Sequence, residues 1–296
     1  MNIRKSNLAP ALFSLALSFM LLTGCSQENS MAPTPTTQLD ASADVAESVA
    51  TAVGEESGGV MDLVGDIFEL TAAIQLGKAT NDGFLDHREA SYDEATGTWT
   101  LIVQRERGVP GDVPYGYWDR IFTYQFFNAA GEVQKFYVTD GDTARTINFN
   151  VIEGDGYHKN FRLAHDLKSI QGAFVATNTH AELITVNGTY ARAAVDTITT
   201  KNFTRTSDHT LDVTVIDLVG PRDSFNTRGK LRRNLAQKVS GRITGTFHAD
   251  IVFDGERGYA EKTVDKEIDI VIGDGEAEIV VGGRKYMSNI RTGQVE

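Results

Sequence analysis

Hydrophobic and polar residues alternate along short segments of the chain from about residue 84 onward. Phe122, Tyr124 and Phe126 fall on one face of an extended strand, whereas Thr123 and Gln125 fall on the other. The same two-residue period recurs at 99–103, 147–151 and 243–254. This period predicts antiparallel strands with one buried face and one solvated face.

Short segments containing Gly, Asn or Asp separate these runs. They lie at 93–97, 128–131, 140–142, 154–156 and 273–275. Such segments are typical of hairpin turns, and no helical pattern lies between the strands. We therefore predict a mainly β fold: a large antiparallel meander, forming a curved or open barrel-like sheet, over residues 79–296.

A helical period precedes this region, over residues 43–78. Val45, Val49 and Val53 recur every four residues before the glycine pair 58–59. A second stretch then places one set of residues on a common face, namely Val60, Leu63, Val64, Ile67, Thr71 and Ile74. Asp62, Asp66 and Glu69 lie elsewhere on that helix, and Gly77 is a plausible stop. The pattern predicts amphipathic helices that pack on the sheet.

The β region also contains an internal repeat. A shift of 57 residues places 188–217 on 245–274 without a gap. Residues 211–215 (LDVTV) then align with 268–272 (IDIVI), and Asp217 aligns with Asp274. Because the alignment keeps the strand period, we interpret it as a duplicated hairpin that extends one sheet.

The first 24 residues are typical of a secretory signal peptide. Arg4 and Lys5 precede an apolar run over 8–22, which is too short for a typical membrane-spanning helix. The run ends in Leu-Thr-Gly-Cys at 22–25, which resembles the lipobox of bacterial lipoproteins. This resemblance implies cleavage after Gly24 and lipidation of Cys25, with palmitate or a similar acyl chain.

Cys25 is the single cysteine of the chain, so no internal disulfide is expected. Residues 25–42 hold this cysteine and a Ser/Thr/Pro-rich stretch that we interpret as a flexible tether. Ser26 stands where a signal for retention in the inner membrane would have Asp. By analogy with lipoprotein sorting, we expect an outer-membrane lipoprotein that faces the periplasm or the cell surface.

The chain is acidic, with 28 basic and 40 acidic residues and a net charge of −12. Such a charge argues against nucleic-acid binding. One basic cluster stands out between the two repeat copies: Arg222, Arg228, Lys230, Arg232 and Arg233. It is either a solvated loop or an anion-docking loop for phosphate or carboxylate groups, for example of lipid headgroups or peptidoglycan.

Motifs for catalysis and metal binding are missing from the sequence. The six histidines form no HExxH or H-x-H pattern, and no Gly-x-Ser-x-Gly or phosphate-binding loop occurs. Ser207, Asp208 and His209 have the letters of a catalytic triad, but neighbours along one strand do not converge on one substrate atom. We therefore predict no enzyme activity, no cofactor and no metal.

Several short motifs resemble those of β-rich envelope lipoproteins of Gram-negative bacteria that have no assigned activity. They are Tyr92-Asp93 with 96–99 (TGTW), and 282–286 (GGRKY) with 290–295. The resemblance implies architecture and location only. We expect a membrane-anchored protein with a structural or binding role and an envelope protein, lipid or peptidoglycan as partner. The alternatives are a carrier of lipid or another hydrophobic ligand, and a glycan hydrolase.

Overall fold

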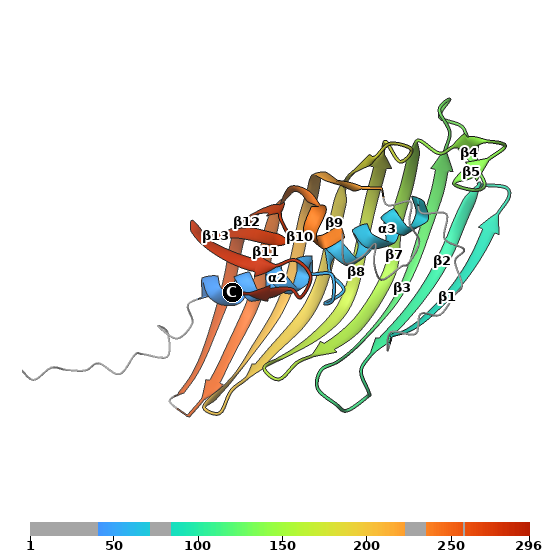
Figure 1. Cartoon of the computed structure of the whole chain (residues 1–296). Coiled ribbons are helices and arrows are strands. Elements are labelled where there is room, and N and C mark those ends of the chain that lie inside the picture. Colours follow the sequence, from blue (N-terminus) through green and yellow to red (C-terminus); the bar gives the residue numbers. More distant parts are fainter. Residues whose placement is uncertain (1–40, 72–83, 223–234, 257) are drawn as a thin grey trace, which may run out of the picture.

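One large antiparallel sheet dominates the fold. The computed structural model describes residues 41–71, 84–222, 235–256 and 258–296. Thirteen strands join in one sheet, and neighbours along the chain are almost always neighbours in the sheet. The path β1-β2-β3-β7-β8-β9-β10-β11-β12-β13-β14-β15 does not close on itself, and Figure 1 shows a strongly curved sheet. The predicted mainly β, antiparallel fold is confirmed.

The first half of the sheet contains β1 (Phe84–Asp93), β2 (Thr98–Arg107), β3 (Tyr115–Phe127), β4 (Val133–Gln134), β7 (Thr146–Lys159), β8 (Leu163–Thr177) and β9 (Leu183–Thr199). The second half contains β10 (Phe203–Pro221), β11 (Ser240–Gly255), β12 (Gly258–Gly273), β13 (Glu276–Val281), β14 (Arg284–Asn289) and β15 (Gln294–Val295). A separate small pair consists of β5 (Val138–Thr139) and β6 (Asp142–Thr143).

The two-residue period sets which face of each strand is buried. Phe122, Phe149 and Phe174 lie side by side on β3, β7 and β8, and each is at most 1% exposed. The ring centroids of Phe122 and Phe149 are 4.9 Å apart. Phe247 and Phe253 of β11 are buried on the same side. These residues form the hydrophobic core on the concave face of the sheet.

Two helices lie along this concave face, α2 (Ala41–Val53) and α3 (Val60–Thr71) (Figure 1). All twelve residues of α3 are buried, including its three acidic residues. Residues 54–59 connect the helices, and the N–H groups of Glu55 and Glu56 donate to the carbonyls of Ile290 and Arg291 (2.9 and 2.8 Å). The helix connection is thereby joined to the end of the chain. The predicted helix residues Ile74 and Gly77 lie outside the described residues.

Both segments of the predicted duplication form long hairpins. Residues 188–217 fall on β9 and β10, and 245–274 fall on β11 and β12. Asp217 and Asp274 both adopt a positive φ, 46° and 53°.

One predicted turn is wrong. Residues 154–156 (Gly-Asp-Gly) lie inside β7, where Gly154 pairs with Arg120 and Gly156 with Trp118. A Cβ at Gly154 would lie 2.9 Å from Cγ of Arg120, and one at Gly156 would lie 2.8 Å from Cδ1 of Trp118. The glycines therefore make room for two large inward side chains of β3 rather than for a chain reversal.

Candidate functional site

A cluster of buried ion pairs joins α3 to the first three strands. The acidic members are Asp62, Asp66 and Glu69, at most 4% exposed. The basic members are Arg88 of β1, Arg105 of β2 and Arg120 of β3. Three carboxylates thus face three guanidinium groups, so the buried charge of this acid–arginine cluster is balanced. Balanced pairing is what buried ionised groups require.

Asp62 is the centre of the acid–arginine cluster. Its carboxylate accepts hydrogen bonds from Nη1 of Arg105 (2.9 and 3.0 Å) and from Nη1 of Arg120 (2.5 Å). Arg120 also donates from Nη2 to the carbonyl of Gly58 (2.5 Å), at the start of α3. At the other end of the helix, Nη2 of Arg88 lies 3.0 Å from Oε2 of Glu69. The cluster therefore fixes both the position and the rotation of α3.

A second buried group, the His–Asp cluster, joins α2 to β8, β9 and β10. Asp196 of β9 is 3% exposed and accepts hydrogen bonds from Oγ of Ser48 and from Nδ1 of His165. Nη2 of Arg192 donates to Nε2 of His165. These partners assign the neutral tautomer of His165, with its proton on Nδ1. Nδ1 of His209 lies 3.8 Å from Oδ2 of Asp196.

The His–Asp cluster has the residue types of a hydrolytic triad but not its connections. In a triad, the serine hydroxyl bonds to the histidine and the aspartate orients that histidine. Here the hydroxyl of Ser48 bonds to Asp196, and Nε2 of His165 is occupied by Arg192. The histidine therefore does not link the serine to the aspartate, as it does in a triad.

Burial controls the protonation of the histidines on this face. It lowers the pKa of His209 to about 4, with the charge of Asp196 acting in the opposite direction. It also lowers the pKa of His158 to about 4 and that of His165 below its usual value. Burial alone would raise the pKa of Asp196, but His165, His209 and Ser48 together hold it below its usual value. Hence the interior contains an ionised aspartate and neutral histidines at pH 7.

Two further ion pairs join α2 to the ends of neighbouring strands. Asp44 contacts Nη1 of Arg205, near the start of β10. Oε1 of Glu47 lies 3.3 Å from Nη1 of Arg162, in the β7–β8 turn. Burial raises the pKa of Glu47, while Arg162 acts to lower it.

Neither cluster was predicted from the sequence. Asp196 and His209 interrupt the apolar phase of their strands, since Ala194, Ile198 and Leu211 on the same faces are buried. A polar residue in an apolar phase is thus a usable signal for a buried partner. The partner itself was not predictable, because bonded residues in these clusters lie up to 148 residues apart along the chain.

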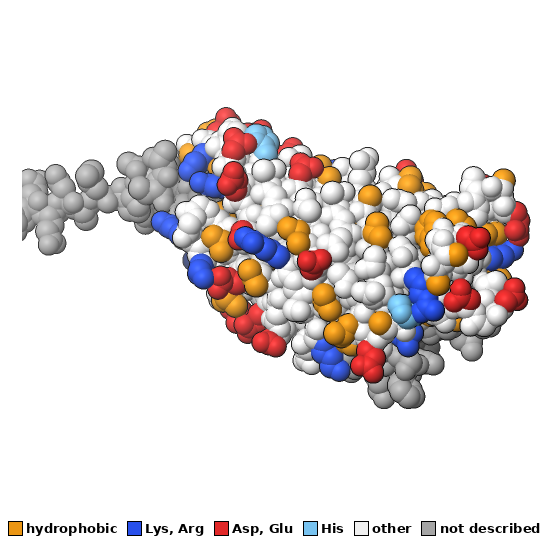
Figure 2. All heavy atoms as spheres, turned by 90° about the horizontal axis from the view of Figure 1, so that it is seen from above, with side chains coloured by type: hydrophobic (Ala, Val, Ile, Leu, Met, Phe, Trp, Pro, Cys, Tyr) orange, Lys and Arg blue, Asp and Glu red, His pale blue; other side chains and the backbone are white. Residues whose placement is uncertain are grey.

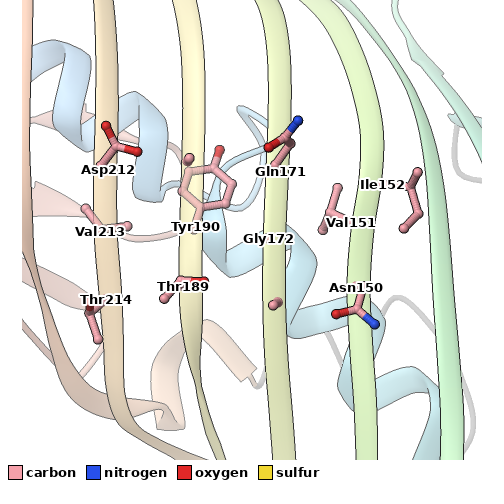
Figure 3. A pocket seen from close by; sticks show the side chains of 12 residues that line it. Asn150, Val151, Ile152, Gln171, Gly172, Thr189, Tyr190, Asp212, Val213 and Thr214 are labelled. Atoms are coloured by element: carbon pink, nitrogen blue, oxygen red, sulfur yellow. The ribbon is translucent and has the colours of Figure 1, made fainter.

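The convex face has an open hollow of about 670 Å³ over β7, β8, β9 and β10. Figure 3 shows it with the helices behind the strands, and with Asn150, Gln171 and Asp212 around small residues at its floor. The hollow forms at Gly172 and Ala173 because their side chains are small. The lining offers hydrogen-bond donors and acceptors but only one carboxylate, so it contains no carboxylate pair for acid–base chemistry.

The predicted site residues are only partly described. Cys25 lies outside the described residues, as do Arg228, Lys230, Arg232 and Arg233 of the basic loop. Arg222 follows β10, and its N–H donates to the carbonyl of Glu182 (2.7 Å). Its Nη1 lies 3.3 Å from the hydroxyl of Tyr137. The structure therefore does not test anion docking by this loop.

Within residues 41–71, 84–222, 235–256 and 258–296, no group of three or more His, Cys, Asp or Glu side chains is arranged to hold a metal ion. None of the helices in this part of the chain is long and apolar enough to cross a membrane. Comparison of the sequence with protein-family models and curated proteins, and of the fold with solved structures, finds no match.

Proposed function

We propose that this chain is a membrane-anchored envelope lipoprotein with a structural or binding role rather than a catalytic one. The lipobox at 22–25 supports the anchor. One observation supports the absence of a catalytic role: the serine, histidine and aspartate that have the residue types of a hydrolytic triad bond to other buried side chains in the interior. Ser48, His165 and Asp196 are each at most 5% exposed, so a substrate has no access to them.

In this proposal, α2 and α3 are amphipathic helices that permanently fill the concave face. Val49, Leu63 and Ile67 support this role, because they belong to the same core cluster as the aromatic residues of the sheet. The acid–arginine and His–Asp clusters hold the polar sides of the helices. Partners would then dock on the convex face or at the strand ends. Figure 2, a view from above, shows charged and hydrophobic side chains interspersed on this side of the molecule.

Crosslinking in intact cells, followed by purification from membranes, tests the binding role. We expect the wild-type protein to recover a defined envelope partner. A Cys25→Ala variant, held away from the membrane, should recover less of it. Recovery of no partner, together with turnover of an envelope substrate by the purified protein, would contradict the proposal.

A carrier of lipid is the second candidate, because aromatic residues line the inner face. Phe122, Tyr124, Phe126, Phe247 and Phe253 all point inward and are at most 5% exposed. For a ligand to reach them, the helices must leave their ion pairs. Native mass spectrometry of the gently purified protein separates the two candidates: a co-purifying lipid favours the carrier, and a protein without lipid favours the binding role.

A further inference from the structure

Two neighbouring hairpin tips differ from the rest of the surface. They are the β7–β8 tip, residues 159–163, and the β9–β10 tip, residues 199–204, together called the paired tips below. Phe161 is 89% exposed, the largest exposure among the large hydrophobic residues of the described chain. Oδ1 of Asn160 accepts hydrogen bonds from the N–H groups of Arg162 (2.9 Å) and Leu163 (2.7 Å). The tip is therefore well ordered, and it holds Phe161 out into solvent.

A backbone hydrogen bond joins the paired tips to each other. The N–H of Thr199 donates to the carbonyl of Arg162 (3.1 Å). In the second tip, Oγ1 of Thr200 accepts from the N–H of Phe203 (3.2 Å). The tips thus form one continuous rim at the lower ends of the strands in Figure 1, opposite β4 and β5.

The paired tips are also basic in an acidic protein. Residues 157–165 and 197–207 contain no Asp or Glu, although the whole chain contains 40. Lys159, Arg162 and Lys201 are exposed. The neighbouring β2–β3 and β11–β12 turns carry the acidic residues Asp112 and Glu256.

We propose that the paired tips dock into the interface of an anionic phospholipid bilayer. Phe161 would enter the boundary between headgroups and acyl chains, and Lys159 and Lys201 would lie among the anionic headgroups. Arg162, beside them, is paired with Glu47 (3.3 Å). The acidic residues farther along the strands do not prevent this contact, because salt screens exposed charges beyond about 8 Å.

The position of the anchor agrees with this contact. Residues 26–40, between the lipidated cysteine and α2, reach at most about 50 Å. The α2 helix begins at Ala41 and its Glu47 bonds to Arg162 in the first tip. This inference rests on the proposed function, because the lipid on Cys25 would keep the tips near a bilayer.

The test uses mature lipidated protein with tryptophan introduced at one of two exposed Phe positions. Phe161→Trp reports on the tips. Phe136→Trp is the matched control, since Phe136 is 53% exposed and lies beyond the opposite end of β3. The probe is an excess of phosphatidylglycerol vesicles with brominated acyl chains. We expect the added emission of the Phe161→Trp variant to shift to shorter wavelength and to be quenched, whereas that of Phe136→Trp is unaffected. Equal behaviour of the two variants overturns the proposal.

Charge provides the second readout. In the Phe161→Trp background, Lys159→Gln with Lys201→Gln should lower the ratio of inserted to free tips by about twenty-fivefold, because each lysine near an anionic surface contributes about fivefold. Insertion that is unchanged by the two substitutions, or that is as strong in phosphatidylcholine vesicles as in phosphatidylglycerol vesicles, contradicts the role of the cations. Vesicle flotation separates the two proposals. Flotation without quenching supports the lipid anchor and refutes docking of the paired tips. Quenching without flotation in a dilute gradient supports docking of the paired tips and refutes the lipid anchor.

Discussion

Replacing Asp62 by Asn tests whether the acid–arginine cluster fixes α3. Asn has the same shape as Asp but no charge, so Arg105 and Arg120 would lose the carboxylate that both contact. These groups are at most 6% exposed. Removing one partner of a buried ion pair costs about 3–5 kcal/mol. For a domain of this size, that corresponds to a fall of about 10 °C in Tm.

A matched control comes from an exposed pair with good geometry. Asp269 accepts from Nε and Nη2 of Arg242 (2.6 and 2.7 Å), but the two side chains are 37% and 56% exposed. An exposed pair contributes less than about 1 kcal/mol. Asp269→Asn should therefore shift Tm by a few degrees at most.

Urea unfolding followed by far-UV circular dichroism measures both variants. A free energy of unfolding of Asp62→Asn within about 1 kcal/mol of the wild-type value would contradict a structural role of the cluster, because that is the limit expected for a surface pair. Adding Arg120→Met to Asp62→Asn should recover part of the loss, because the cluster is again balanced, with two carboxylates and two guanidinium groups.

Three further predictions concern the stability contributed by buried residues. Acidification from pH 6.5 to 4 should destabilise the fold. His158 and His209, with pKa values of about 4, stay neutral in the folded state but are protonated in the unfolded state, which lowers the free energy of unfolding by up to about 3 kcal/mol each. His209→Gln should therefore flatten the pH dependence of urea unfolding, and an unchanged slope would contradict this assignment. Gly154→Val should destabilise by at least about 2 kcal/mol through contact with the Arg120 side chain, whereas Gly273→Ala, where no atom lies within 4 Å, should be nearly neutral in the same assay. Ser48→Ala should cost about 1–3 kcal/mol because Asp196 loses a buried donor, and thermal unfolding that matches the wild type would argue against that bond.

The strands were predictable because their period is local. Phe122, Tyr124 and Phe126 alternate with polar residues, and this pattern alone identifies the buried face. The turn predicted at 154–156 was wrong for a reason that is not local. Those glycines accommodate Trp118 and Arg120 from the adjacent strand, and the sequence does not reveal which side chains of that strand will lie opposite them.

The acidic residues of α3 show a second limit. Their spacing placed them away from the apolar stripe, and a solvated face is the usual outcome for such residues. In a deeply curved sheet, however, a helix is enclosed on more than one side. Asp62 and Asp66 are consequently buried against arginines of β2 and β3, which the sequence separates from them by about 40 to 60 residues.

Analysis of the N-terminal residue tests the central proposal, membrane anchoring through Cys25, most directly. The protein would be expressed in a Gram-negative host with labelled palmitate, and its N-terminal peptide would be identified by mass spectrometry. The account predicts a mature chain that begins at Cys25 and carries acyl chains, with no label in a Cys25→Ser variant. An unmodified N-terminus, or label that persists without the cysteine, would contradict it.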